Sequence, residues 1–360
     1  MRRIGGVWGQ VVAMDNLHTA YGKARQGKRR RPDVAQFSLD LESNLLTLQR
    51  ELVAGAYAPG PYRQFTVYER KPRLISVAPF RDRVVHHAVM NVLEPLLDQR
   101  FIPDTYACRK DKGVHRAVDR YQQFARQNAY VLKLDIARYF PSIDREILKQ
   151  QLARRLKDRF VLDLLYRIID NGPDTDEPVR FFPGDDLVSL SERQRGLPIG
   201  NLTSQFFANL YLDGFDHWLK ETVRVKGYLR YVDDLYLLGN DKQALWDLRD
   251  AIIGKLEALR LVLRADKTQI YRTTERVDVL GYRVSRYRRW LRNDNGVRFR
   301  RRLKRMSRLY RAGEMDWPAI NASVQSWTGH ARHAQTEGLR TAIFSEVSFN
   351  KGAGRGAAGA

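Results

Sequence analysis

A pair of adjacent aspartates, Asp233 and Asp234, lies between two short apolar runs and constrains the fold most strongly. The runs, 228–230 and 235–238, have the length and composition of β-strands, and a glycine bounds each on its outer side. The pattern predicts a β-hairpin with two carboxylates at its tip. Like charges at this spacing raise each other's pKa unless a cation neutralises them, and oxygen-only ligands favour Mg²⁺ or Mn²⁺. A solvated turn is the alternative for the pair taken alone.

A third carboxylate, Asp135, ends the apolar, β-prone run 130–135. This run is interpreted as a buried strand that delivers Asp135 at its C-terminal edge. If the strand lies beside the hairpin, Asp135 and Asp233 can bridge two metal ions roughly 3.5–4 Å apart. One ion would activate an attacking 3′-hydroxyl and the other would neutralise the leaving pyrophosphate, as phosphoryl transfer requires. A turn residue at the end of a strand is the alternative for Asp135 alone.

The segments 133–140 and 231–234 resemble the two metal-binding motifs of reverse transcriptases. Between them, residues 196–205 occupy the place where most of these enzymes carry Gln-Gly-x-x-x-Ser-Pro. Ile199 replaces the glutamine and Gln205 replaces the proline, and this version is similar to that of the reverse transcriptases of diversity-generating retroelements. The resemblance runs from about residue 15 to about residue 310. Further segments that resemble the family are 80–87, 106–109 and 280–282.

The resemblance implies an RNA-directed DNA polymerase that copies a template RNA into cDNA from deoxynucleoside triphosphates, using two Mg²⁺ ions for which Mn²⁺ can substitute. For the diversity-generating subtype it also implies errors at template adenines and a small basic pentameric accessory protein, a partner that no residue of this chain demonstrates. The alternatives are a group II intron-like or retron-like reverse transcriptase, an RNA-dependent RNA polymerase, or an inactive nucleic-acid-binding relative.

Residue roles follow from the motif positions. Asp135, Asp233 and Asp234 are expected to be catalytic and to bind metal, with the carbonyl of Ile136 as a further ligand. Phe140, five residues after Asp135, matches the aromatic residue under the sugar of the incoming nucleotide. A ring there would clash with a 2′-hydroxyl and so favour deoxynucleotides. Ordinary core packing is the alternative for Phe140.

Other residues match family positions around the nucleotide. Arg73 and Arg81, with Lys71, would grip the triphosphate, because guanidinium groups bind phosphate oxygens in pairs. A solvated hairpin face is the alternative for each of them. Gly200 would leave bare backbone where the base pair packs closely. The full nucleotide-binding set comprises Lys71, Arg73, Arg81, Phe140, Ile199, Gly200, Gln205 and Lys267.

Two members of this set carry distinct expectations. Ile199 offers only shape where a glutamine would offer polar contacts, and losing such a contact could weaken base discrimination by on the order of 1 kcal/mol. Lys267 matches a lysine that protonates pyrophosphate, with a solvated lysine as the alternative.

The chain is strongly basic, with a net charge of +22 and a pI of about 10.2. Such a protein attracts polyanions, and nucleic acid is the commonest. Arginines and aromatic residues alternate through 283–311, as on a surface that meets phosphates and sugars, although a solvated arginine-rich face is the alternative. The residues expected to contact primer and template are Leu280, Gly281, Tyr282, Arg288, Arg289, Arg292, Arg300 and Arg301.

One cysteine, Cys108, excludes an internal disulfide and is interpreted as a small buried residue. No apolar run resembles a signal peptide or a membrane span, which favours a cytoplasmic protein of a prokaryotic cell with no membrane partner.

The pattern of elements predicts an α+β fold with an antiparallel sheet backed by helices on one face, which suits the palm of a right-hand polymerase. A hairpin is expected over 63–77, and helices are expected over 37–54, from 79–82 onward, and over 147–169, 203–220 and 245–259. The fingers would take 1–128 and 145–195, the palm 129–144 and 196–287, the thumb 288–348, and a flexible tail 349–360.

Overall fold

A computed structural model describes residues 2–68, 72–173, 175 and 178–350. The chain divides into two compact units. Unit 1 comprises Met1–Gly113, Lys133–Leu237 and Gln243–Gln269, and unit 2 comprises Val114–Leu132, Leu238–Lys242 and Ile270–Ala360. Within the described ranges, no helix has the length and apolar character that crossing a membrane requires.

The N-terminal part of unit 1 is helical. The predicted apolar face of α4 is confirmed, because Leu45, Leu48 and Leu52 are buried. The helix expected after Pro79 is α5, which packs along α2 through a nearly continuous buried face. The helices of this part are α1 (Trp8–Val11), α2 (Met14–Arg25), α3 (Pro32–Leu39), α4 (Leu41–Val53) and α5 (Phe80–Asp98).

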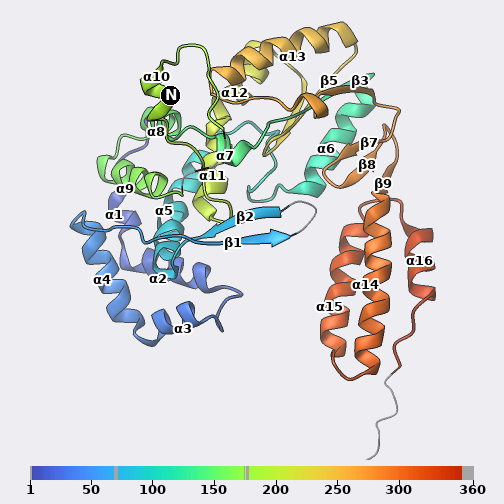
Figure 1. The fold of residues 1–360 in the computed structure, drawn as a ribbon, viewed down its shortest axis with the longest axis horizontal. Helices are drawn as coiled ribbons and strands as arrows, with labels where there is room; N and C mark the ends of the chain where they lie inside the picture. The colour runs from blue at the N-terminus through green and yellow to red at the C-terminus, as the bar shows by residue number, and fades with distance from the viewer. Residues whose placement is uncertain (1, 69–71, 174, 176–177, 351–360) are drawn as a thin grey trace, which may run out of the picture. The chain divides into compact units, whose positions relative to one another are not determined.

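The predicted hairpin before α5 is confirmed. Strands β1 (Arg63–Tyr68) and β2 (Pro72–Val77) pair antiparallel, with Phe65 opposite Ile75 and Val67 opposite Arg73. Figure 1 shows the two strands projecting beyond α5. Most of β1 is exposed, whereas the end of β2 at Ser76 is buried. The hairpin is therefore anchored by the C-terminal half of β2.

A four-stranded sheet has the order β4-β5-β3-β6. The hairpin predicted at the paired aspartates is confirmed as β4 (Gly227–Tyr231) and β5 (Asp234–Gly239), and the predicted strand ending at Asp135 is confirmed as β3 (Tyr130–Asp135). Strand β6 spans Gln269–Arg272. A two-residue connection makes β4 and β5 antiparallel neighbours. The order also places β3 beside β5, as predicted for a strand that brings Asp135 to the hairpin of Asp233.

Helices surround this sheet in unit 1. Tyr228 and Arg230 of β4 both contact Asp216 of α12, so α12 covers one face of the strand. The helices of this part are α7 (Tyr139–Ser142), α8 (Arg145–Arg155), α9 (Arg159–Asp170), α10 (Leu187–Ser191), α11 (Leu202–Tyr211), α12 (Asp213–His217), the π-helix η1 (Trp218–Thr222), α13 (Lys242–Glu257) and the 3-10 helix η2 (Ala265–Lys267).

Unit 2 combines a small sheet with four helices. Phe299, Trp327 and Phe344 form an aromatic core among the three C-terminal helices, with the rings of Phe299 and Trp327 stacked 4.0 Å apart. Figure 1 shows those helices side by side beneath the strands. The elements are α6 (Val114–Gln127), β7 (Val277–Val279), β8 (Tyr282–Val284), β9 (Arg289–Leu291), α14 (Asn293–Arg311), α15 (Trp317–Ala331) and α16 (Glu337–Ser345).

Three expectations about elements are corrected. The single helix over 147–169 is wrong, because Leu156 adopts an extended conformation and forms a β-bridge with Ile4 that separates α8 from α9. The helix over 203–220 is interrupted at Leu212 and ends in a π-helical turn. The helix over 37–54 begins only at Leu41, because Asp40 separates it from α3.

Cys108 is exposed rather than buried. Its φ of 51° places it in a left-handed turn conformation at the surface. The expectation of burial came from residue type alone, and the local turn overrides it.

Candidate active site

Asp135 is the buried end of β3, and two cations hold its carboxylate. The ammonium of Lys267 forms a close ion pair with Oδ2, and Nε of Arg264 lies 3.7 Å from Oδ1. The backbone N–H of Arg264 also donates to the carbonyl of Asp135 at 2.8 Å. Residues 264–267 therefore fix both the main chain and the side chain of Asp135.

The tip of the β4–β5 hairpin meets the end of β3. Val232 has a φ of 55°, which lets the chain reverse in a two-residue turn. The backbone N–H of Ile136 donates to the carbonyl of Asp233 at 3.1 Å. This bond joins the two motifs directly, so the structure brings Asp135, Asp233 and Asp234 together as predicted.

The three carboxylates perturb one another. Burial, reinforced by Asp234 and Asp135, raises the pKa of Asp233 to about 6. Burial also raises the pKa of Asp234, to which Asp135 adds, while Lys133 and Lys267 oppose the rise. Burial is therefore the main reason that the two carboxyl groups of the turn resist ionisation.

A divalent cation fits this donor set by chemistry, since the donors are carboxylate oxygens. Nowhere in ranges 2–68, 72–173, 175 and 178–350 do three or more His, Cys, Asp or Glu side chains already converge to hold an ion. Lys267 occupies one oxygen of Asp135 in this arrangement. The carbonyl of Ile136 stays a predicted ligand that nothing in the geometry tests.

A buried ion pair beneath the hairpin was missed by the sequence analysis. Nη2 of Arg230 lies 2.6 Å from Oδ2 of Asp216, and the hydroxyl of Tyr228 donates to the same carboxylate at 2.6 Å. Arg230 also donates to the carbonyl of Val232 at 3.1 Å, which ties the ion pair to the catalytic turn. An arginine inside an otherwise apolar strand was the available signal.

The segment around Gly200 docks on the first hairpin. Gly200 has a φ of 113°, and a Cβ there would lie 3.0 Å from Cγ2 of Ile75. The carbonyl of Ile199 accepts from the N–H of Ser76 at 2.9 Å, and Asn201 donates to the carbonyl of Ser76 at 2.9 Å. Ile199 itself is half-buried. Gly200 therefore allows a close approach to β2 in addition to the predicted approach to a base pair.

A second arginine supports that segment from behind. Arg145 is fully buried and donates to the carbonyl of Gly196 at 3.1 Å and to that of Gly172 at 2.9 Å. Arg145 was not predicted as a functional residue, because in the sequence it is only the first of several charged residues in α8.

Two predicted nucleotide contacts are accessible. Phe140 lies half-buried in α7 next to Tyr139, whose ring is buried and whose hydroxyl donates to the carbonyl of Ala208 at 2.5 Å. The core position thus belongs to Tyr139, which leaves Phe140 available. Gln205 is exposed on the first turns of α11.

The predicted triphosphate cations differ in their surroundings. Arg73 is exposed on β2. Arg81 is engaged by the carboxylate of Glu51 and lies over the ring of Tyr57 at 5.1 Å. Lys71 lies outside the described residues.

The predicted primer and template contacts lie in unit 2. Leu280 and Gly281 form the turn between β7 and β8, with φ values of 48° and 93°, so the expected hairpin is present. Tyr282 is buried and donates to the carbonyl of His330 at 2.9 Å. Arg289 is held by Asp119 at 2.7 Å. Among the predicted primer and template contacts, the arginines whose side chains reach the surface are Arg288, Arg292, Arg300 and Arg301.

Comparison with known proteins gives concordant matches. Residues 64–284 match the family described as reverse transcriptase (RNA-dependent DNA polymerase). The chain is 25% identical to protein YkfC of Escherichia coli (strain K12), over 69% of this chain and 73% of that protein. It is 23% identical to the group II intron-encoded protein LtrA of Lactococcus lactis subsp. cremoris, over 58% of this chain and only 33% of that protein.

Solved structures of telomerase are also similar. The apo telomerase of Candida tropicalis aligns with a TM-score of 0.48 and 14% identity, over 69% of this chain and 60% of that one. The telomerase of Candida albicans aligns with a TM-score of 0.43 and 13% identity, over 81% of this chain and 56% of that one.

The family match spans more than half of the chain and contains both aspartate motifs, the Gly200 segment and the hairpin that bears Gly281. Its members are enzymes that polymerise DNA on RNA, and the α+β architecture is that of a right-hand polymerase. This chain belongs to the reverse transcriptase family.

Proposed function

We propose that the chain copies a template RNA into cDNA by adding deoxynucleotides to a primer 3′-end. The observation that carries this proposal is the hydrogen bond from Ile136 to Asp233, which sets Asp135 beside the Asp233–Asp234 turn at one end of a sheet. The fingers are assigned to 1–128 and 145–195, the palm to 129–144 and 196–287, the thumb to 288–348 and a tail to 349–360.

The carboxylates of Asp135, Asp233 and Asp234 would bind two Mg²⁺ ions, or two Mn²⁺ ions in their place. Bound there, the ions would supply the charge neutralisation and hydroxyl activation that phosphoryl transfer needs. Asp135 and Asp233 are the principal ligands in this proposal, with Asp234 and the carbonyl of Ile136 contributing. Arg230 is a positioning residue, because it holds the turn through the carbonyl of Val232 at 3.1 Å.

Other side chains select and orient the nucleotide. Phe140 stacks beneath the sugar and excludes a 2′-hydroxyl. Arg73 reaches phosphate oxygens from the exposed face of β2, and Arg81 can join it only by releasing Glu51. Lys267 pairs with Asp135, and its match to the family's lysine supports a role as the proton donor to pyrophosphate.

The finer assignment is to a diversity-generating retroelement, with copying that is error-prone at template adenines. Ile199 and Gln205 support it, because they replace the glutamine and proline of most reverse transcriptases. The small basic pentameric accessory protein belongs to this assignment by resemblance alone. A group II intron-like role is the second candidate, and the similarity to LtrA favours it.

Sequencing of the cDNA product tests both the proposed reverse transcription and the finer assignment to a diversity-generating retroelement. The purified chain is given a primed RNA or a primed DNA of the same sequence, with deoxynucleotides or ribonucleotides, in Mg²⁺. We expect deoxynucleotide addition on the RNA, with substitutions concentrated opposite adenines. Accurate cDNA would overturn the diversity-generating assignment and leave the group II intron-like role. Addition of ribonucleotides at equal rates would contradict the role of Phe140.

A further inference from the structure

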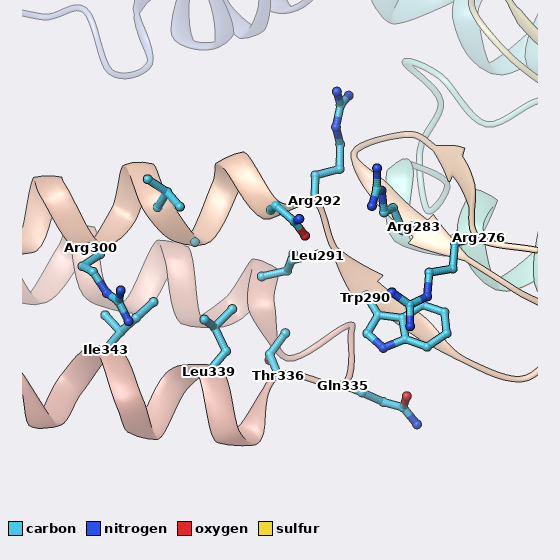
Figure 2. A pocket seen from close by; sticks show the side chains of 13 residues that line it. Arg276, Arg283, Trp290, Leu291, Arg292, Arg300, Gln335, Thr336, Leu339 and Ile343 are labelled. Carbon is cyan, nitrogen blue, oxygen red and sulfur yellow. The ribbon is translucent and has the colours of Figure 1, made fainter.

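Unit 2 contains a basic cavity, and Arg292 and Arg300, two of the residues expected to contact primer and template, line it. Its volume is about 340 Å³, within the range of pockets that hold small ligands. It opens between the small sheet and the starts of α14 and α16, as Figure 2 shows. Among the residues that the structure describes, four arginines and no acidic side chain line it: Arg276, Arg283, Arg292 and Arg300.

The sheet supplies one wall of the cavity. Asp278, Arg283 and Trp290 are cross-strand partners on β7, β8 and β9, so their side chains share one face. The guanidinium of Arg276 lies over the indole of Trp290 at 4.5 Å, and Figure 2 shows the two stacked at the rim. This wall therefore combines an indole, whose one face is covered by Arg276, with the cation of Arg283 and the carboxylate of Asp278.

Two of the four arginines are held loosely by neighbouring carboxylates, whereas Arg300 pairs with Glu346 at 3.0 Å. Nε of Arg283 lies 3.5 Å from Asp278, and Nε of Arg292 lies 3.7 Å from Asp294. Side chains this exposed, at 43% and 36%, gain little from such pairs. A phosphate can replace these contacts with shorter, paired hydrogen bonds.

Apolar residues close the cavity floor. Leu291, Leu339 and Ile343 contribute apolar lining, and Figure 2 shows Ile343 beside Arg300. A ligand that fits must therefore combine an anionic group with a flat, partly apolar body. A nucleotide has this chemistry, whereas an acidic peptide would leave the indole and the floor uncovered.

We infer that the cavity holds one unpaired nucleotide, with its phosphate on the arginines and its base against Trp290. A duplex keeps its bases inside the stack, so only a nucleotide outside a duplex can enter. Nucleic acid is chosen as the ligand on the strength of the proposed function. The source is either a free nucleotide or one unit of a single strand.

Binding of a fluorescein-labelled single-stranded RNA tests this site. All measurements use the full chain carrying Asp233→Asn and Asp234→Asn, so a failure of polymerisation cannot be mistaken for a failure of this site. Trp290→Leu is expected to weaken binding about tenfold, as the loss of one stacked base does. The matched control is Trp317→Leu, which removes an exposed indole of α15 and should leave affinity within twofold.

Two double variants that each remove two arginines distinguish binding in the cavity from general electrostatic attraction of RNA to a basic protein. Arg283→Gln with Arg292→Gln should weaken binding more than Arg302→Gln with Arg305→Gln, which removes two exposed arginines of α14 outside the cavity. Equal effects of the two pairs, or unchanged binding in Trp290→Leu, would overturn the inference.

Two further arms identify the ligand and guard against misfolded variants. Photocrosslinking of 5-bromouridine RNA to the protein that keeps all its tryptophans should label the tryptic peptide 290–292. Labelling only at other peptides would overturn the inference. AMP that competes at millimolar concentration would identify a free nucleotide as a ligand, and competition by RNA alone would identify the strand. Equal competition by polyglutamate would show an anion site that does not read bases and would also overturn it.

Discussion

Asp233 is half-buried beside a second carboxylate. This arrangement lowers the stability of the folded protein when Asp233 is charged. Its pKa is raised to about 6, so the folded chain binds a proton that the unfolded chain releases near pH 4. Folding stability therefore falls as pH rises through this window and stays reduced above it.

Asp233→Asn should remove this penalty. In chelator at pH 7.5 the variant should be more stable than wild type by on the order of 1 kcal/mol, and the difference should shrink at pH 4.5. Urea unfolding at the two pH values measures it. The control is Asp247→Asn on the exposed face of α13, which should behave as wild type. A variant less stable than wild type at pH 7.5 would contradict the charge account.

Lys267 competes with any cation for Asp135, because its ammonium already pairs with Oδ2. Lys267→Met should therefore tighten Mn²⁺ binding several-fold, by roughly the 1 kcal/mol that such a pair can contribute. Titration calorimetry of the chain without nucleotide measures the affinity, with Lys242→Met on α13 as control. Weaker metal binding in Lys267→Met would show that the lysine supports the site instead.

At the scale of elements, Gly200 couples the segment before α11 to the β1–β2 hairpin. Gly200→Ala should cost about 1–3 kcal/mol, since both the φ of 113° and the contact with Ile75 oppose a Cβ. Adding Ile75→Ala should cost less than the sum of the two changes, because it relieves the contact and leaves the backbone strain. Thermal unfolding of the four proteins gives the coupling. Simple additivity would mean that Ile75 does not oppose the Cβ.

The ion pair of Arg230 and Asp216 supports the β4–β5 turn from below. Arg230→Met should destabilise the protein by about 3–5 kcal/mol, because it leaves Asp216 charged and buried. The double variant with Asp216→Leu should recover much of that stability, yet it should stay slow in catalysis because the carbonyl of Val232 loses its donor. Denaturation and primer extension together separate these effects. A double variant with full activity would remove Arg230 from the positioning role.

The sequence was most informative where neighbouring residues decide the structure. The β1–β2 and β4–β5 hairpins, β3 and α5 were predicted correctly, because alternation, apolar runs and turn residues act locally. The break between α8 and α9 was missed, since it depends on a β-bridge from Leu156 to the distant Ile4. The partners of Arg230 and Arg81 were likewise unpredictable, because Asp216 and Glu51 come from other elements.

At the scale of the whole molecule, the basic residues that give the chain its net charge of +22 have different roles. Some arginines are internal: Arg230 donates to the carbonyl of Val232 in the turn that bears Asp233, and Arg145 donates to the carbonyl of Gly172. The aromatic residues of the basic C-terminal region divide in the same way, since Phe299 is core and Tyr287 is exposed. Composition predicted a polyanion partner, but only the tertiary structure shows which side chains can reach one.

Single-nucleotide extension of a primed RNA tests the central claim most directly. Wild type is compared with Asp233→Asn/Asp234→Asn and with Asp247→Asn/Asp250→Asn, which makes the same chemical change on the exposed face of α13. We expect Mg²⁺-dependent addition by wild type and by the α13 variant, and a loss of at least about 100-fold in the turn variant. Equal extension by all three would contradict catalysis at the Asp135, Asp233 and Asp234 cluster.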